Sequence, residues 1–149
     1  MSGNPPTLTR SLTALVATLA AALLGAGCGG SSGSRHPVAV AAVNERDFHI
    51  SAPATLKAGE VDLQVDNHGP DHHELIVAPL HGASLPLRAD GFIVDEESLE
   101  QSEPGSLEPG TEGSKRELRV HLAPGRYVFF CNMAGHYLGG MHTIVTVTG

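Results

Sequence analysis

The segment CNMAGHYLGGM, residues 131–141, places a cysteine, a histidine and a methionine at intervals of five residues. Cys131, His136 and Met141 offer a thiol, an imidazole and a thioether, and all three groups can bind transition metals. The chain has only two cysteines, so a chemical reason is needed for one of them to lie beside these donors. Whether the three side chains can reach one metal ion depends on the elements that carry them.

Several short segments alternate hydrophobic and polar residues, the pattern of half-buried β-strands. EVDLQVD and ELRVHL show it most clearly, while RYVFFC and HTIVTV are rich in β-branched and aromatic residues. Turn sequences such as KAGE, NHGPD and LAPGR separate these segments. The sequence therefore predicts an all-β sandwich of seven to eight strands, near residues 38–43, 46–50, 54–56, 60–66, 73–78, 115–122, 126–131 and 141–147.

Residues 83–114 break the strand pattern and are rich in Gly, Pro, Ser and Glu. This length is unusual for a simple connection, which predicts an irregular insertion packed on the surface, with a short helix near VDEESLEQ. Residues 95–112 of the insertion contain no Lys or Arg and carry these acidic residues: Asp95, Glu96, Glu97, Glu100, Glu103, Glu108 and Glu112. They form either an ordinary solvated face or a surface that steers a basic partner.

The phase of the last two strands places both sulfur atoms inside the sandwich, because successive strand residues point to opposite faces. Cys131 shares its face with Phe129, and Met141 shares its face with Val145. Cys131 and Met141 are therefore predicted to face the core from neighbouring strand ends.

Two imidazoles complete the set of candidate donors. In DHHELIVAP, His73 is in phase with Leu75 and His72 is in phase with Glu74, so His73 should point inward and His72 outward. His136 belongs to the loop between the last two strands and can fold back over the same point. Three donors at strand ends and one on a loop are thus expected to converge.

His73, Cys131, His136 and Met141 together match the ligands of a blue, type 1 copper site: two imidazoles, a thiolate and a weak axial thioether. Thiolate and thioether suit Cu(I), and imidazole suits both oxidation states. Each residue alone has an ordinary interpretation as a core or surface residue, but all four in matching phase favour one copper ion. Zinc could use the same donors in a tetrahedral site, although a methionine ligand favours copper.

The sequence resembles the cupredoxins, the family of plastocyanin and azurin. PGRYVFFCNMAGHYLGGMHTIVTV resembles the last two strands of that family with their ligand loop, and VDNHGPDHHELIV resembles the segment that bears the first histidine. The likeness covers most of residues 38–149 and fails over 83–114. It implies a Greek-key β-sandwich and a hydrogen bond from the Glu74 amide to the Cys131 sulfur. The family often has Asn at position 74, which leaves the role of the Glu74 side chain open.

The N-terminal segment has the features of an export signal. Arg10 is the only charged residue before Cys28, and the apolar run of residues 12–27 is short for a membrane-spanning helix. LLGAG before Cys28 resembles a bacterial lipobox, which implies a lipid on Cys28; ordinary cleavage near this point is the alternative. We predict a signal peptide at 1–27, the lipidated cysteine and a Gly/Ser linker at 28–36, and a copper-binding domain at 37–149. The domain would then be exported and attached to the outer face of the cell membrane.

The charge balance argues against nucleic acid as a partner. Of the 9 Lys and Arg residues, Arg10 is lost with the signal peptide, which leaves 8 against 16 acidic residues. We expect a monomeric one-electron carrier for a redox protein such as a cytochrome or an oxidase. The resemblance implies an apolar docking patch around the edge of His136, made by Met133, Ala134, Tyr137, Leu138, Gly139 and Gly140.

A copper delivery or storage protein without a redox role is the alternative function. Enzymatic activity is not expected, because the copper oxidases and nitrite reductases of this superfamily use a second copper site and further domains. The binuclear copper domain of respiratory oxidases uses two cysteines in the ligand loop, where this chain has Cys131 alone.

Overall fold

The computed structural model describes residues 38–99 and 101–149, so the predicted signal peptide, the predicted lipidated cysteine and the whole predicted linker lie outside the described residues. Within that part of the chain, no helix is long and apolar enough to cross a membrane. The elements are one short 3₁₀ helix, η1 (Glu96–Ser98), and the strands β1 (Ala39–Arg46), β2 (His49–Ser51), β3 (Thr55–Lys57), β4 (Gly59–Asn67), β5 (His73–Pro79), β6 (Gly105–Gly110), β7 (Lys115–Leu122), β8 (Gly125–Phe130) and β9 (His142–Thr148).

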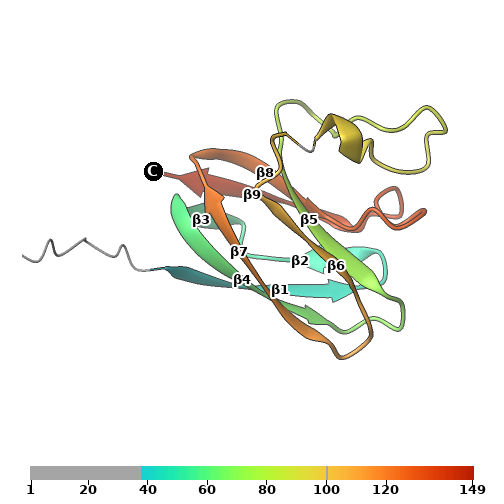
Figure 1. Cartoon of the computed structure of the whole chain (residues 1–149), viewed down its shortest axis with the longest axis horizontal. Helices are drawn as coiled ribbons and strands as arrows, with labels where there is room; N and C mark the ends of the chain where they lie inside the picture. Colours follow the sequence, from blue (N-terminus) through green and yellow to red (C-terminus); the bar gives the residue numbers. More distant parts are fainter. Residues whose placement is uncertain (1–37, 100) are drawn as a thin grey trace, which may run out of the picture. The chain divides into compact units, whose positions relative to one another are not determined.

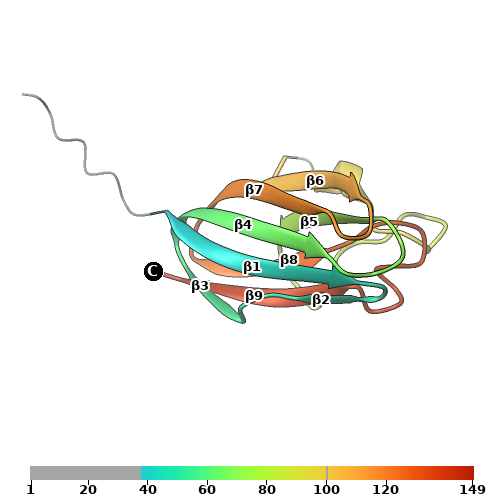
Figure 2. The ribbon, with the colours of Figure 1, turned by 90° about the horizontal axis from the view of Figure 1, so that it is seen from below.

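The strands form two sheets that pack face to face (Figure 1). One sheet has the order β2-β1-β4-β7, and Figure 2 shows β1, β4 and β7 side by side in it. The other has the order β3-β9-β8-β5-β6. Both sheets are mixed, because β1 pairs with β4 and β3 with β9 in parallel while the other pairs are antiparallel. The predicted all-β sandwich is confirmed.

The core between the sheets follows from the alternation seen in the sequence. In β4, Val61, Leu63 and Val65 are fully buried, while Gln64 between them is exposed. Burying one such side chain stabilises the fold by about 1.5–3 kcal/mol, so this alternation fixes the register of the strand. Cys131 and Met141 belong to the same buried cluster, which places both sulfurs at one end of the main core.

A second apolar cluster lies on the outer face of the five-stranded sheet, under the excursion between β5 and β6. Figure 1 shows the backbone of this excursion, which carries η1, in yellow. Strand β5 is buried on both faces, because Ile76 and Ala78 point into this outer cluster. Leu85, Val94 and Leu99 of the excursion cover them. The predicted packed insertion is therefore present, and η1 lies within the predicted helical segment.

The structure contains a ninth strand, β6, inside the segment predicted to be irregular. Its sequence, GSLEPG, has two glycines and a proline and lacks a clear alternation, so its strand signal is weak. It forms the edge of the five-stranded sheet, where proline is tolerated, and pairs with β5 through a register shift between His73 and Leu75. All eight predicted segments are strands, and β6 is one more that the sequence did not predict among the described residues.

Candidate metal centre

Three of the four predicted donors meet at one end of the sandwich. The ligand atoms of His73, Cys131 and His136 all lie within 4.8 Å of one another, and all three residues are buried. His73 is the first residue of β5, Cys131 follows β8, and His136 lies in the loop before β9. The Sγ of Cys131 is 3.5 Å from the Nδ1 of His136, and the two imidazole centroids are 5.2 Å apart.

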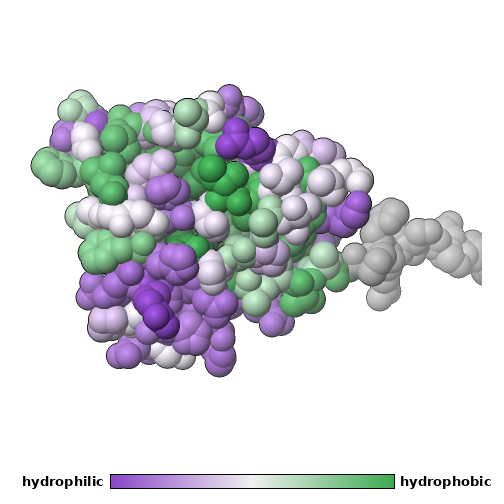
Figure 3. Space-filling view, turned by 180° about the vertical axis from the view of Figure 1, so that it is seen from behind, coloured by the Kyte–Doolittle hydropathy of each residue, from purple (hydrophilic) through white to green (hydrophobic). Residues whose placement is uncertain are grey.

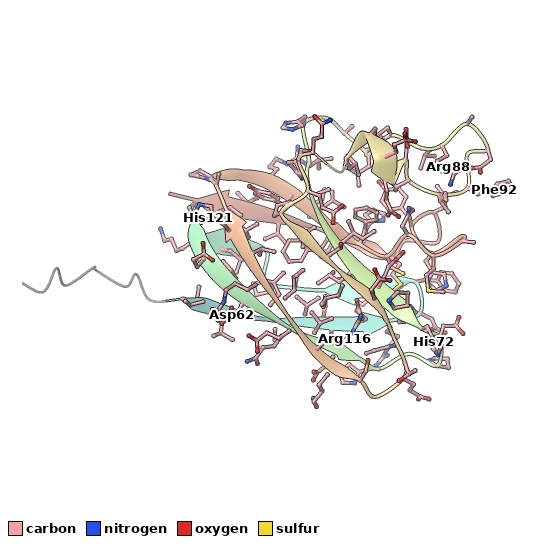
Figure 4. All side chains as sticks on the ribbon, in the orientation of Figure 1. Asp62, His72, Arg88, Phe92, Arg116 and His121 are labelled. Atoms are coloured by element: carbon pink, nitrogen blue, oxygen red, sulfur yellow. The ribbon has the colours of Figure 1, made fainter. Side chains whose placement is uncertain are left out.

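The strand phase assigned the two adjacent histidines correctly. His73 is fully buried, whereas His72 is exposed, on the outer surface at the same end of the molecule (Figure 4). Only His73 can reach Cys131, since its side chain points between the sheets with Leu75.

Met141 is fully buried and comes directly before β9. Its carbonyl accepts a hydrogen bond from the Cys131 N–H at 3.1 Å, and its own N–H donates to the carbonyl of His136 at 2.9 Å. These bonds fasten the methionine backbone to the other two loop residues. The role of Met141 as axial ligand stays a prediction.

The donor atoms fit a metal ion because one of them has no other partner. The Nδ1 of His73 is buried and accepts or donates no hydrogen bond, although an orphaned buried polar atom is costly. Its other ring nitrogen, Nε2, is bonded to Asp47. A buried Nδ1 beside a thiol and a second imidazole is what a metal with His–Cys–His ligands requires, and this donor set suits type 1 copper.

Burial raises the pKa of the Cys131 thiol to about 11. Hydrogen bonds from the backbone N–H groups of Met133 and Glu74 oppose this rise in pKa, because they stabilise the thiolate. This effect on the pKa is consistent with the predicted bond from the Glu74 amide to the sulfur. Burial also lowers the pKa of His73, which favours the neutral imidazole that metals bind.

The side chain of Glu74, whose role the sequence left open, supports the ligand loop. Its Oε1 accepts a hydrogen bond from the backbone N–H of Asn132 at 2.9 Å. Burial raises the pKa of Glu74, and the nearby carboxylate of Glu96 raises it further. The Glu74 side chain therefore fixes the backbone of Asn132, the residue that follows Cys131.

Asn132 also ties the ligand loop to the excursion, a role that the sequence analysis missed. The Val94 N–H donates to its Oδ1 at 2.6 Å, and its Nδ2 donates to the Val94 carbonyl at 3.0 Å. An asparagine between a cysteine and a methionine gives no sequence signal for such a distant partner. The insertion is consequently part of the support of the site.

The turn between β1 and β2 supplies two further contacts that the sequence analysis missed. The Oδ1 of Asp47 lies 3.0 Å from the Nε2 of His73. The ring of Phe48 lies 5.3 Å from that of His136 and is half exposed. Phe48 has a φ of 59°, in the left-handed region that non-glycine residues seldom adopt. The sequence signal that could have indicated these contacts is the turn itself, which carries Asp47 next to Phe48.

The predicted docking patch needs one correction. Tyr137 is buried in the outer cluster, with its ring 5.6 Å from that of Phe130, because β8 and the excursion provide an apolar pocket for it. Leu138 and the two glycines after it are exposed as predicted.

A buried carboxylate lies across the core from the ligand loop. Glu45 of β1 is fully buried, and its Oε2 is paired with the guanidinium of Arg116 on β7. Its Oε1 has no partner among the described residues. Burial raises the pKa of Glu45 to about 7, although Arg116 favours the charged form.

Neither a protein-family model nor a curated protein sequence matches the chain. Solved structures do. A reduced auracyanin from Roseiflexus castenholzii is 18% identical, with a TM-score of 0.57, over 76% of this chain and 98% of that one. Auracyanin A, a blue copper protein from Chloroflexus aurantiacus, is 16% identical, with a TM-score of 0.55, over 75% of this chain and 100% of that one.

Reduced rusticyanin is also similar, at 14% identity and a TM-score of 0.52, over 76% of this chain and 82% of that one. At such identities the likeness establishes the fold. The chain has the cupredoxin fold, and its cluster of His73, Cys131 and His136 suits a type 1 copper site.

Proposed function

We propose that this protein is a blue copper protein that carries single electrons. The observation that supports this most directly is the buried, unpartnered Nδ1 of His73 beside the Sγ of Cys131 and the imidazole of His136. Core packing alone does not explain why a buried thiol and two imidazoles meet in an apolar core, because apolar side chains would fill the same space without burying polar atoms. When bound, copper supplies one-electron chemistry between Cu(I) and Cu(II).

The protein scaffold favours electron transfer over metal delivery. Backbone hydrogen bonds join Cys131, His136 and Met141, and Glu74 and Asn132 brace the residues that follow the cysteine. Donors held in this way change position little when the charge of the metal changes. Metal release would require breaking several of these bonds together.

His136 is the candidate ligand nearest the surface, and we propose that electrons pass at its edge. The docking patch is apolar and lies around it on the loop and the β1–β2 turn: Phe48, Met133, Ala134, Leu138, Gly139 and Gly140. Figure 3 shows hydrophobic and strongly hydrophilic residues gathered on different parts of one face of the molecule. Weak redox encounters use small contacts of this kind.

The partner we propose is a redox protein with a basic surface, such as a cytochrome or an oxidase. One acidic residue of the excursion is joined to the ligand loop, because Glu96 accepts a hydrogen bond from the side chain of Asn132. Glu97 and Glu108 are exposed. Such charges raise the rate of encounter and lose their effect at high salt.

We further propose that a lipid on Cys28 holds this domain at the outer face of the cell membrane. The sequence pattern before Cys28 and the Gly/Ser linker after it support this location. Cys28→Ala should release the protein from membranes and leave copper binding unchanged. Continued membrane association of this variant would show that another anchor exists.

Copper titration of the purified protein tests the site. An intense visible thiolate-to-copper band is expected for the wild type and for His72→Ala, and its loss is expected for His73→Ala. A band that survives in His73→Ala but not in His72→Ala would contradict the ligand assignment.

Voltammetry with copper assayed before and after separates the two functions. Reversible cycling with copper retained supports the carrier, whereas loss of Cu(I) to a mild chelator would instead support delivery or storage. We propose no enzymatic reaction.

A further inference from the structure

Asp47 lies in the two-residue turn between β1 and β2, directly behind His73. Its Oδ1 is 3.0 Å from the Nε2 of His73 and 3.3 Å from the backbone nitrogen of Asp71, which donates to it. The Asp47 side chain is 25% exposed and that of His73 is fully buried. One carboxylate oxygen thus joins the first hairpin to the start of β5.

Gly69 makes this contact possible. A Cβ at position 69 would lie 2.4 Å from the Asp47 Oδ1 and 2.7 Å from the His73 Nε2. The Gly69 N–H is held by the Oδ1 of Asn67 at 2.9 Å, so the chain passes close over the bond between the carboxylate and the imidazole. Any larger residue here would push Asp47 and His73 apart.

The chemical consequence concerns which ring nitrogen carries the proton. A neutral imidazole has one N–H and one free lone pair, and a carboxylate can only accept a hydrogen bond. The proton must therefore sit on Nε2, facing Asp47, and the lone pair on Nδ1. Nδ1 is the buried atom without a partner, and it is the ring nitrogen that Asp47 leaves free for a metal shared with Cys131 and His136.

We propose that Asp47 is a positioning residue that orients the His73 ring and keeps its proton on Nε2, so that Nδ1 is available to a metal. The proposal rests on the proposed copper site for its functional meaning. A carboxylate behind a metal-binding histidine also makes the imidazole a stronger donor, and loss of such a partner typically costs 10–100-fold in metal affinity.

The variants Asp47→Ala, Asp47→Asn and Asp71→Asn separate this role from a general effect of charge. Asp71 is a matched control, because its exposed carboxylate also lies near the site, 4.0 Å from the Nε2 of His136, whereas the hydrogen bond and ion pair of His73 are made by Asp47. Asn at position 47 keeps an acceptor oxygen and loses the charge. Far-ultraviolet circular dichroism verifies that each variant is folded.

The first measurement uses metal-free, ¹⁵N-labelled protein and detects the His73 Nε2–H proton by NMR. In the wild type and in Asp71→Asn, this proton should be shifted downfield and exchange slowly with water. Asp47→Ala should lose the signal to rapid exchange, and Asp47→Asn should restore it. A wild-type ring that carries its proton on Nδ1, or an unchanged signal in Asp47→Ala, would overturn the proposal.

The second measurement is Cu(II) affinity by competition with a chelator. Asp47→Ala should bind 10–100-fold more weakly than the wild type, with Asp47→Asn between them and Asp71→Asn close to the wild type. Equal affinities for Asp47→Ala and Asp71→Asn would contradict the role of Asp47. If Asp47→Ala does not fold, Asp47→Asn must still bind copper more weakly than Asp71→Asn.

The two measurements fail separately. A wild-type protein that binds no copper would refute the proposed function, and the NMR result on the metal-free protein would still decide whether Asp47 orients His73.

Discussion

The ring of Phe48 lies against the imidazole of His136, with 5.3 Å between the ring centroids, although the two residues come from opposite ends of the domain sequence. Phe48 also covers Gly139, where a Cβ would lie 2.3 Å from the phenyl ring. One aromatic side chain in a strained turn therefore limits the access of solvent to the outermost candidate ligand.

Removal of this ring should expose His136. In metal-free protein, Phe48→Ala should increase several-fold the rate at which diethyl pyrocarbonate modifies His136, as measured by mass spectrometry of the peptide that contains it. Leu138→Ala is the control, because Leu138 is equally exposed and no ring contact joins it to His136. Equal rates in the wild type and Phe48→Ala would show that Phe48 does not shield the imidazole.

Substitutions of Met141 should move the reduction potential in opposite directions. Met141→Leu removes a donor that favours Cu(II), so the potential should rise; Met141→Gln supplies a harder oxygen donor, so the potential should fall. Cyclic voltammetry of the copper-loaded variants measures both shifts. Shifts of the same sign in both variants would argue against an axial role for Met141.

Copper binding should release the Cys131 proton, because the pKa of this thiol is raised to about 11 by burial. Below that pKa, each step of one pH unit makes the thiolate about tenfold more available, and apparent Cu(II) affinity should rise about tenfold with it. Chelator competition between about pH 6 and pH 8 tests this. An affinity independent of pH would mean that copper does not displace the proton of the Cys131 thiol.

The buried Glu45 should make the metal-free fold less stable as pH rises. Its pKa is about 7 in the folded protein against an ordinary 4.5, so the folded state binds more protons than the unfolded chain between these values. The contribution of Glu45 to the free energy of unfolding should therefore be highest below pH 4.5. It should fall by roughly 3 kcal/mol as the pH rises to 7.

Urea unfolding of wild type and Glu45→Gln between pH 5 and pH 7 isolates this effect, since Gln cannot ionise. Burial lowers the pKa of His73, which contributes the opposite slope in both proteins and cancels in the difference. Parallel pH profiles for the two proteins would exclude Glu45 as the cause.

Much of the fold could be predicted from alternation alone, because a half-buried strand carries its orientation in its own sequence. The phase of His73 against His72 and of Cys131 against its strand neighbours was correct for this reason. Strand β6 was missed because its six residues include two glycines and Pro109, which leaves Leu107 as its one aliphatic side chain.

The support of the site could not be predicted, because it depends on contacts between residues far apart in sequence. Asp47 meets His73 only when β1 and β5 are in place, and Asn132 meets Val94 only when the excursion has folded over the outer sheet. Tyr137 was assigned to the surface because its pocket is made by that same excursion. No short motif carries information of this kind.

The turn of the first hairpin meets both the start of β5 and the ligand loop, because Asp47 is bonded to His73 and Phe48 lies against His136. A chain that is still being synthesised lacks these contacts until residue 141 has emerged and β9 has paired with β8. Until then the Cys131 thiol does not have both imidazoles and the thioether beside it. A folding intermediate in which either β5 or the ligand loop is not in place cannot bind metal with all four predicted donors. Metal binding would therefore be the last step of folding, and it would show that the domain has reached its native structure.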